Sequence, residues 1–231
     1  MTHSRSIIFP LLILLVLPLF ITACGNQDDV QRLTQLNREL RQELSEAKVK
    51  LESASQGSEK EAFLSINMRD IKARIVTNKG TIEVEFYPEA APIHVFNFVT
   101  RAESGFYDGT KFHRVIPGFM IQGGDPNTRT DNRATYGQGG PIVSIPHEFN
   151  DITHSRGVLS MARVSDVRQG AGSQFFIMHA DTPRLDNEYT VFGKATSGLD
   201  VVDAIANTET SSQFRDQPVE HVIIERIEVF R

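Results

Sequence analysis

Short apolar segments that alternate with polar residues recur from residue 71 to the end of the chain. The clearest pair is 71–77 and 82–86, separated by Asn78-Lys79-Gly80, which predicts a β-hairpin. Further strands are predicted at 111–115, 119–122, 157–162, 174–179, 190–193 and 222–230, separated by Gly, Pro, Asn and Asp. Many short strands without a repeating strand–helix alternation favour a closed antiparallel barrel over a doubly wound sheet.

Two helices are expected within this β-rich region. The first lies in residues 91–107, where Ile93, Phe96 and Val99 share one helical face and Gly105 ends the helix. The second is 199–206, with the sequence LDVVDAIA. Two helices against eight short strands describe a mainly β domain, which we place at residues 67–231.

An uncharged stretch, residues 7–21, precedes the single cysteine of the chain, Cys24. Fifteen residues that include Pro10 and Pro18 are short for a spanning helix and are typical of an export signal. The letters ITAC, which end at Cys24, resemble the lipobox of bacterial lipoproteins, in which the signal is cut before a cysteine that carries the lipid. We therefore expect residues 1–23 to be a lipoprotein signal peptide and Cys24 to be lipidated; an uncleaved anchor is the alternative.

Residues 24–66 have a different composition, rich in Gln, Glu, Arg, Leu and Ser and free of proline. Apolar residues recur at spacings of three and four, as in a coiled coil, with a polar Asn37 at an a position. The predicted seam consists of Val30, Leu33, Asn37, Leu40, Leu44, Ala47, Leu51 and Ala54. The seam is short, so either a solvated helical spacer or a homodimer through residues 30–54 is consistent with it. A break in the helix is expected around Gly57.

Several function classes lack their sequence signals. The 29 acidic against 24 basic side chains give a net charge of −5, which provides no electrostatic case for nucleic acid. The glycine pairs are not followed by the Lys-Ser/Thr of a phosphate loop, and Ser173 does not lie in a nucleophile elbow. His147 and His154 do not form a zinc motif, and we interpret them as surface histidines beside a turn. We predict no metal site.

The stretch KFHRVIPGFMIQGGDP, residues 111–126, places a cation in an apolar run. Arg114 and Gln122 are eight residues apart, so on an extended chain without a bulge they point to the same face. An arginine and an amide on an apolar wall need partners. Either they bond each other, or they present donors to a ligand that also occupies an apolar pocket.

Four segments, FHRVIPGFMIQGGDP, GVLSMAR, GSQFFIMHAD and LDNEYTVFGKATSGLDVVDAI, resemble the signature segments of the cyclophilin family of peptidyl-prolyl cis/trans isomerases, in the same order and with similar spacing. The resemblance covers about residues 69–231. It implies a closed eight-stranded antiparallel barrel capped by two helices, with a proline-binding groove on its outer face, and no cofactor. A proline-containing polypeptide is the implied substrate.

The resemblance also implies roles for individual residues. Arg114 would act on the amide before proline, and Gln122 would orient it. The implied substrate-binding residues are Phe119, Met120, Phe176 and Leu185 at the proline, His113 and Ile116 at the pocket edge, and Ala162, Arg163 and Gln174 beside the preceding residue. Three positions depart from the family pattern. Arg184 stands where many members have tryptophan, Tyr189, also expected in the groove, where many have histidine, and Arg163 where asparagine is common.

Together these features predict a lipid-anchored, extracytoplasmic isomerase that assists the folding of exported proteins, attached to a bacterial membrane through Cys24. The alternative is a module that binds proline-containing segments as a chaperone or scaffold with little turnover.

Overall fold

The computed structural model describes residues 27–140 and 144–231. The predicted signal peptide and the predicted lipidation site, Cys24, lie outside these residues. The chain divides into two compact units, residues 1–54 and 55–231, and each is considered by itself.

One long helix, α1 (Gln27–Asn67), contains the predicted seam. Its leucines at 33, 40, 44 and 51 are exposed. The break predicted around Gly57 is wrong, because the helix is continuous through this residue. A single glycine costs a helix interior only about 1 kcal/mol, and the residues around it are good helix formers. No helix in the described part of the chain is long and apolar enough to cross a membrane.

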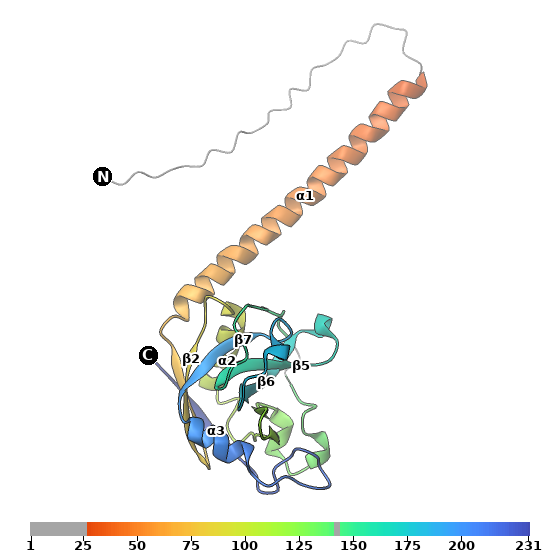
Figure 1. Cartoon of the computed structure of the whole chain (residues 1–231). Coiled ribbons are helices and arrows are strands. Elements are labelled where there is room, and N and C mark those ends of the chain that lie inside the picture. Colours follow the sequence, from red (N-terminus) through yellow and green to blue (C-terminus); the bar gives the residue numbers. More distant parts are fainter. Residues whose placement is uncertain (1–26, 141–143) are drawn as a thin grey trace, which may run out of the picture. The chain divides into compact units, whose positions relative to one another are not determined.

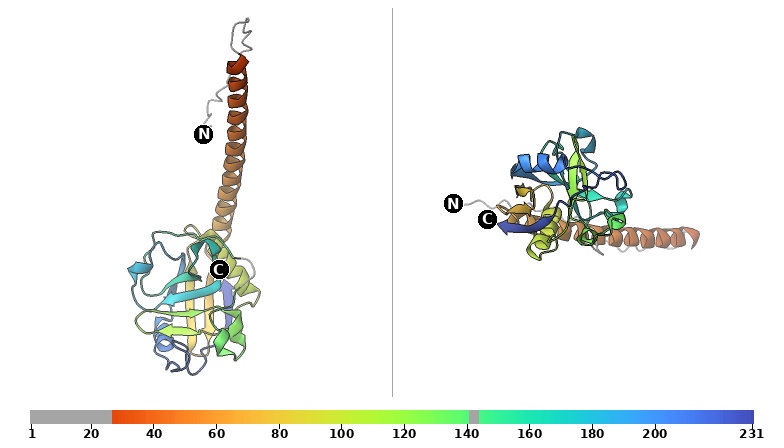
Figure 2. Two further views of the ribbon diagram at one scale, coloured as in Figure 1. Left: turned by 90° about the vertical axis from the view of Figure 1, so that its right-hand side faces the viewer. Right: turned by 90° about the horizontal axis from the view of Figure 1, so that it is seen from below.

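Eight antiparallel strands form one sheet, with the order β3-β4-β6-β5-β7-β2-β1-β8. The hairpin predicted at 71–86 is confirmed, with Thr77 paired to Gly80 at its turn. The strands are β1 (Lys72–Thr77), β2 (Gly80–Phe86), β3 (Arg114–Ile116), β4 (Met120–Gly123), β5 (Val158–Arg163), β6 (Ala171–Met178), β7 (Val191–Ser197) and β8 (Ile224–Phe230). They curl around a shared interior (Figure 1; Figure 2).

The sheet is a curled half-barrel, so the prediction of a closed barrel is wrong. Its outer strands, β3 and β8, are not neighbours in the sheet; an isolated bridge between Lys111 and Ile223 links the chain segments that precede them. The reason lies at β3, which has only three residues. The backbone N–H of Val115 donates to the carbonyl of Asp216, at 2.8 Å, so the loop before β8 occupies the hydrogen-bonding edge that closure would require.

Two helices cover the interior, as predicted: α2 (Pro92–Glu103) and α3 (Leu199–Ala206). The buried face of α2 is not the predicted one. Phe96 is 40 % exposed, whereas Val95, Phe98 and Val99 are buried. Both candidate faces have helical spacing and share Val99, so spacing alone does not choose between them. Phe98 decides, because its ring packs against those of Phe86, Tyr107, Phe175 and Phe192 at centroid distances of 5.1–5.5 Å.

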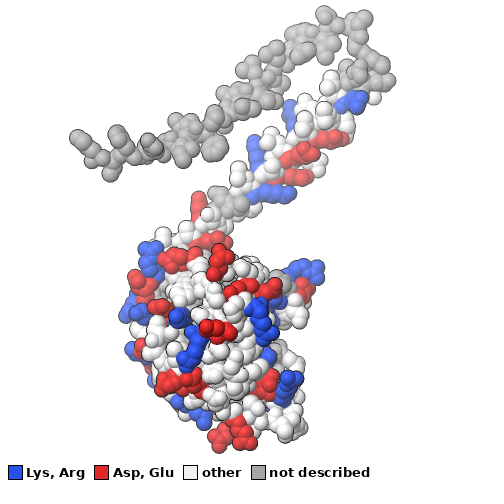
Figure 3. All heavy atoms as spheres, in the orientation of Figure 1, with Lys and Arg blue, Asp and Glu red and all other residues white. Residues whose placement is uncertain are grey.

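Charged side chains of both signs are interspersed over the face of the molecule seen in Figure 3. Surface ion pairs among the described residues include Arg74 with Glu83 at 2.6 Å and Arg226 with Glu228 at 2.7 Å. On the face drawn in Figure 3, no large field of a single sign develops.

Candidate active site

The hairpin β3–β4 places Arg114 directly opposite Gln122. Its turn contains Pro117 and Gly118, where Gly118 has φ +74° and the N–H of Phe119 donates to the carbonyl of Ile116 at 3.0 Å. These features are those of a turn that needs glycine at its third position. Arg114 and Gln122 share a face, as predicted, but the reason is cross-strand pairing: the chain reverses between them, so an extended count of eight does not apply.

A row of side chains continues from this pair across the sheet. Gln122 pairs with Phe176 on β6, and Phe176 pairs with Ser160 on β5. The neighbouring residues Val115 and Ile121 point to the opposite face and are buried in the interior. The outer face therefore carries one polar and one apolar element side by side, Arg114 with Gln122 and the Phe176 ring.

Hydrogen bonds fix the direction of two side-chain amides, that of Gln122 in this row and that of Gln174 on β6. Gln174 Nε2 donates to the carbonyls of Gly137 and Gly139, at 3.0 and 2.7 Å. Because carbonyls only accept, the Gln174 oxygen must face the other way, where it accepts from Gln122 Nε2 at 2.9 Å. The Gln122 oxygen is thereby turned to Arg114 Nη1, at 3.4 Å. We call this chain of bonds the amide relay.

A groove of about 360 Å³ opens over this row. It brings together ten of the predicted site residues, with their apolar and polar members on one continuous wall. Its lining is His113, Arg114, Phe119, Met120, Gln122, Tyr136, Gly137, Ala162, Arg163, Phe176, Leu185, Tyr189, Arg215 and Gln217. A second hollow of about 350 Å³ adjoins it and shares Gln122, Gly137, Ala162 and Arg163.

The apolar side of the groove is a cup built over a second hydrophobic cluster, separate from the interior core. Met120 and Phe176 are buried members of this cluster, and Phe119, Leu185 and Tyr189 pack against it. The Tyr189 ring meets the Phe176 ring edge-on at 5.5 Å. Such contacts limit the rotation of Phe176, so the cup has a defined shape.

A buried histidine supports the cup from below. His154 is fully buried and stacks on Phe176 at 6.1 Å, so its interpretation as a surface histidine is wrong. Its Nδ1 lies 2.8 Å from Asp186 Oδ1 and its Nε2 lies 3.0 Å from Ser160 Oγ. Polar groups at this depth require such partners, and here they hold the imidazole parallel to the Phe176 ring.

Arg163 borders both hollows, yet its charged end is already occupied. Its Nε and Nη2 donate to the carbonyl and the carboxylate of Glu188, at 2.8 and 2.9 Å. The guanidinium also lies over the Tyr189 ring, 4.7 Å from its centroid. Arg163 is therefore part of the groove wall, and Arg114 differs from it in having no partner closer than 3.4 Å among the described residues.

His113 lies in the groove lining but is 5 % exposed, and neither ring nitrogen has a hydrogen-bond partner within the described residues. Burial lowers the pKa of His113, against a smaller opposing effect of Asp125. The imidazole is thus held in its neutral form near neutral pH. A buried neutral ring packs as a wall element and carries no charge into the groove.

Arg114 remains accessible: its side chain is 44 % exposed, and its Nε lies 3.6 Å from Asp216 Oδ2. The pair is neither buried nor within hydrogen-bond distance. The guanidinium consequently faces the groove beside the apolar cup.

Two predicted residues lie outside the groove lining. Ile116 packs against the second cluster, and Gln174 lines the adjoining hollow while it supports the amide relay. Four residues were not predicted, namely Tyr136, Gly137, Arg215 and Gln217. They lie in loops without periodic patterning, where sequence gives little signal for position.

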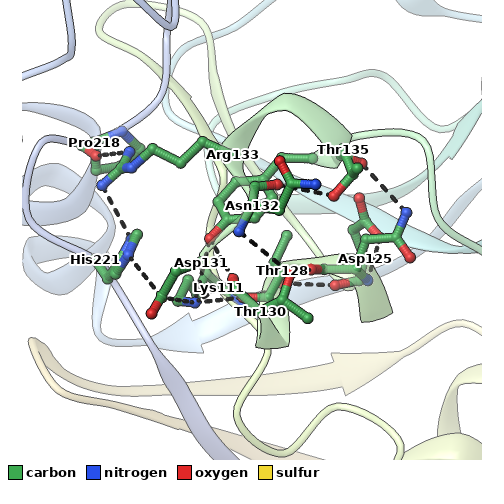
Figure 4. A network of polar contacts seen from close by, with 12 residues as sticks. Lys111, Asp125, Thr128, Thr130, Asp131, Asn132, Arg133, Thr135, Pro218 and His221 are labelled. Carbon is green, nitrogen blue, oxygen red and sulfur yellow. Dashed lines mark hydrogen bonds and ion pairs between the residues drawn. The ribbon is translucent and has the colours of Figure 1, made fainter.

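A polar network holds these loops in place (Figure 4). The buried Lys111 Nζ donates to the carbonyls of Thr128 and Thr130, at 2.5 and 3.1 Å. It lies 3.3 Å from the hydroxyl of Tyr136, which it thereby positions at the groove. Arg133 Nη1 donates to the carbonyl of Pro218 at 2.7 Å and connects this loop to the one that carries Gln217.

The family model described as cyclophilin type peptidyl-prolyl cis-trans isomerase/CLD matches residues 72–229. The chain belongs to this cyclophilin family. The peptidyl-prolyl cis-trans isomerase of Synechococcus elongatus is 46 % identical over 138 residues, which are 59 % of this chain and 89 % of that protein. Peptidyl-prolyl cis-trans isomerase B of Bacillus subtilis is 46 % identical over 143 residues, 61 % of this chain and 94 % of that protein.

Solved structures agree with this assignment. A Cryptosporidium parvum cyclophilin type peptidyl-prolyl cis-trans isomerase, crystallised in the presence of the dipeptide Ala-Pro, matches with a TM-score of 0.63 and 33 % identity. The match covers 69 % of this chain and 99 % of that one. The enzyme is thus a peptidyl-prolyl cis-trans isomerase with the cyclophilin fold. Among the described residues no group of three or more His, Cys, Asp or Glu side chains is placed to hold a metal ion.

Proposed function

We propose that this cyclophilin isomerises X-Pro bonds in the groove described above, with Arg114 as the catalytic residue. The observation that carries the proposal is the accessible guanidinium of Arg114, adjacent to an apolar cup and oriented by Gln122 at 3.4 Å. The cup receives the proline ring, and Phe119, Met120, Phe176 and Leu185 supply its apolar contacts.

The chemistry of the reaction explains why a donor suffices. Rotation about an X-Pro bond must break amide resonance, at a barrier of roughly 18–20 kcal/mol. In the twisted transition state the proline nitrogen becomes pyramidal and regains a lone pair. A guanidinium that donates to this nitrogen stabilises the transition state more than either planar ground state. No proton is transferred, which is consistent with a neutral, buried His113.

The alternative is a module that binds proline-containing segments and turns them over little. A protease-coupled isomerisation assay on the wild type and on Arg114→Ala distinguishes the two. A large loss of rate in the variant supports catalysis at Arg114, and equal, near-background rates in both proteins would support binding alone.

We further propose that the enzyme is a lipoprotein of the bacterial cell envelope that acts on exported proteins. The support lies in the sequence: residues 7–21 form a short apolar stretch, the letters ITAC follow it, and Cys24 is the only cysteine of the chain. Lipidation of Cys24 would attach the isomerase to a membrane through residues 25–66.

For the full-length gene expressed in a bacterium, we expect the mature protein to begin at a lipid-modified Cys24 and to partition into the detergent phase of Triton X-114. Cys24→Ser should move it to the aqueous phase, because the thiol is the attachment point. Mass spectrometry of the N-terminal peptide provides the measurement. An unmodified Cys24 in a mature chain would refute the lipoprotein assignment.

A homodimer through residues 30–54 is the second part of this proposal. Leu33, Leu40, Leu44 and Leu51 leave 55–72 % of their surface exposed on the single chain, which is a large apolar stripe for a helix in water. A parallel partner helix would cover this stripe, with Asn37 fixing the register.

We expect the mature protein to be a dimer by light scattering and Leu44→Glu to be a monomer, since a buried charge at the seam is not tolerated. Gln42→Glu is the matched control: it adds the same charge to an exposed residue outside the seam and should leave the dimer intact. A monomeric wild type at all concentrations would show that the helix is only a spacer.

A further inference from the structure

Arg114 is approached by two elements at different nitrogens of its guanidinium. Gln122, on β4, accepts from Nη1 at 3.4 Å, and Asp216, in the loop before β8, has Oδ2 3.6 Å from Nε. A planar group with neighbours at both ends has fewer orientations available than one held at a single point. The amide relay supplies one neighbour, and the loop supplies the other.

The backbone fastens Asp216 to the strand that carries Arg114. The Asp216 carbonyl accepts from the N–H of Val115, the residue next to Arg114, at 2.8 Å. The acid is therefore held in register with β3, and its position relative to Arg114 does not depend on the side chain alone.

Asp216 also has an unfavourable backbone conformation. Its φ of +64° lies in the left-handed region, where glycine is free of strain and a side chain costs about 1 kcal/mol. Non-glycine residues in such conformations cluster at functional sites. A carboxylate kept at a position that would suit glycine, next to the catalytic arginine, points to a use for that carboxylate.

The loop itself is anchored on its far side (Figure 4). Arg133 Nη1 donates to the carbonyl of Pro218, and Gln217 Nε2 donates to the carbonyl of Arg133, at 2.7 and 3.1 Å. Thr210 and Pro218 form a bridge at its base. The second carboxylate oxygen of Asp216 lies 3.7 Å from Nε of Arg215, whose side chain is 94 % exposed. Asp216 thus has one oxygen toward a solvent-exposed arginine and the other toward Arg114.

We propose that Asp216 is a positioning residue that holds the guanidinium of Arg114 over the proline site, an inference that rests on the proposed catalytic role of Arg114. Because the pair is exposed and its contact is long, the expected effect is modest. It should appear in kcat, since a mobile guanidinium binds the planar substrate as before but meets the twisted nitrogen less often.

The test uses Asp216→Asn and Asp216→Gly in the full mature chain. Both residues tolerate a positive φ, so the loop is expected to fold, and glycine relieves the strain there. We expect kcat to fall about three- to fivefold with KM unchanged, from the usual strength of exposed ion pairs. The Nε–H signal of Arg114 in NMR should show slower rotation of the guanidinium in the wild type than in either variant, where the contact with Gln122 remains.

Glu83→Gln is the matched control, because it removes a carboxylate from the exposed pair with Arg74, outside the groove lining, and should leave kcat unchanged. In the Arg114→Ala background, Asp216→Asn should not lower the rate further, because the residue that it positions is already absent. If Asp216→Asn acted by disturbing the fold, it would lower the rate in this background too. An unchanged or increased kcat in Asp216→Asn would overturn the inference. If Arg114→Ala keeps full activity, the proposed catalytic role itself fails.

Discussion

Replacement of Arg114 by alanine is expected to lower kcat/KM of the isomerase by about 100-fold or more, the usual loss when one preorganised transition-state donor is removed. The side chain is 44 % exposed and its partners lie at 3.4 and 3.6 Å, so its removal leaves no buried charge unpaired and should leave the fold intact. Arg114→Lys, which keeps the charge but lacks the planar fork, should retain an intermediate rate.

The control for this variant is Arg226→Ala. It removes the same charge from β8, where Arg226 pairs with Glu228 at 2.7 Å, and it should be fully active. The protease-coupled assay should also show a flat rate from about pH 7 to about pH 8, because burial lowers the pKa of His113 and the ring is therefore neutral in this range. A bell-shaped profile in the wild type would instead indicate proton transfer.

Phe98→Ala is expected to destabilise the isomerase domain by about 3–5 kcal/mol, as for other buried aromatic residues truncated to alanine. The Phe98 ring is fully buried and touches four other aromatic rings at 5.1–5.5 Å, so its removal opens a cavity at the centre of the interior. For a domain of this size the melting temperature should fall by about 10 °C, measured by calorimetry.

Phe96→Ala provides a control on the same helix. Phe96 is a phenylalanine two residues away that is 40 % exposed, so its truncation should cost less than about 1 kcal/mol. The pair of variants thereby tests which face of α2 is buried. Equal losses for Phe96→Ala and Phe98→Ala would contradict the observed orientation of the helix.

The strands and the site residues were predictable where the signal is local. The hairpin at 72–86 follows from alternation and a glycine at the turn, and Arg114 stands out because it is a cation in an apolar run. The family resemblance added Phe176 and Leu185, which no local pattern connects to Arg114. The structure brings both into the same groove.

What could not be predicted depends on contacts between distant segments. The half-barrel stays open because Val115 bonds to Asp216, a pairing across a hundred residues that leaves no periodic signal. Tyr136 and Gln217 enter the groove on loops held by Lys111 and Arg133. Lys111 begins a predicted strand, and nothing in the sequence indicates that this lysine is buried. The helix through Gly57 shows that strong neighbours can override a residue that usually ends a helix.

The amide relay runs in one direction, and this has a consequence for selectivity. Each amide in it donates toward the glycine carbonyls and accepts from the side of Arg114, so at the Arg114 end the polar wall presents the N–H groups of a guanidinium to an incoming peptide. An ordinary peptide linkage would bring its own N–H against this wall, donor facing donor. The tertiary amide before proline carries a carbonyl and no N–H, so it brings no competing donor toward that guanidinium.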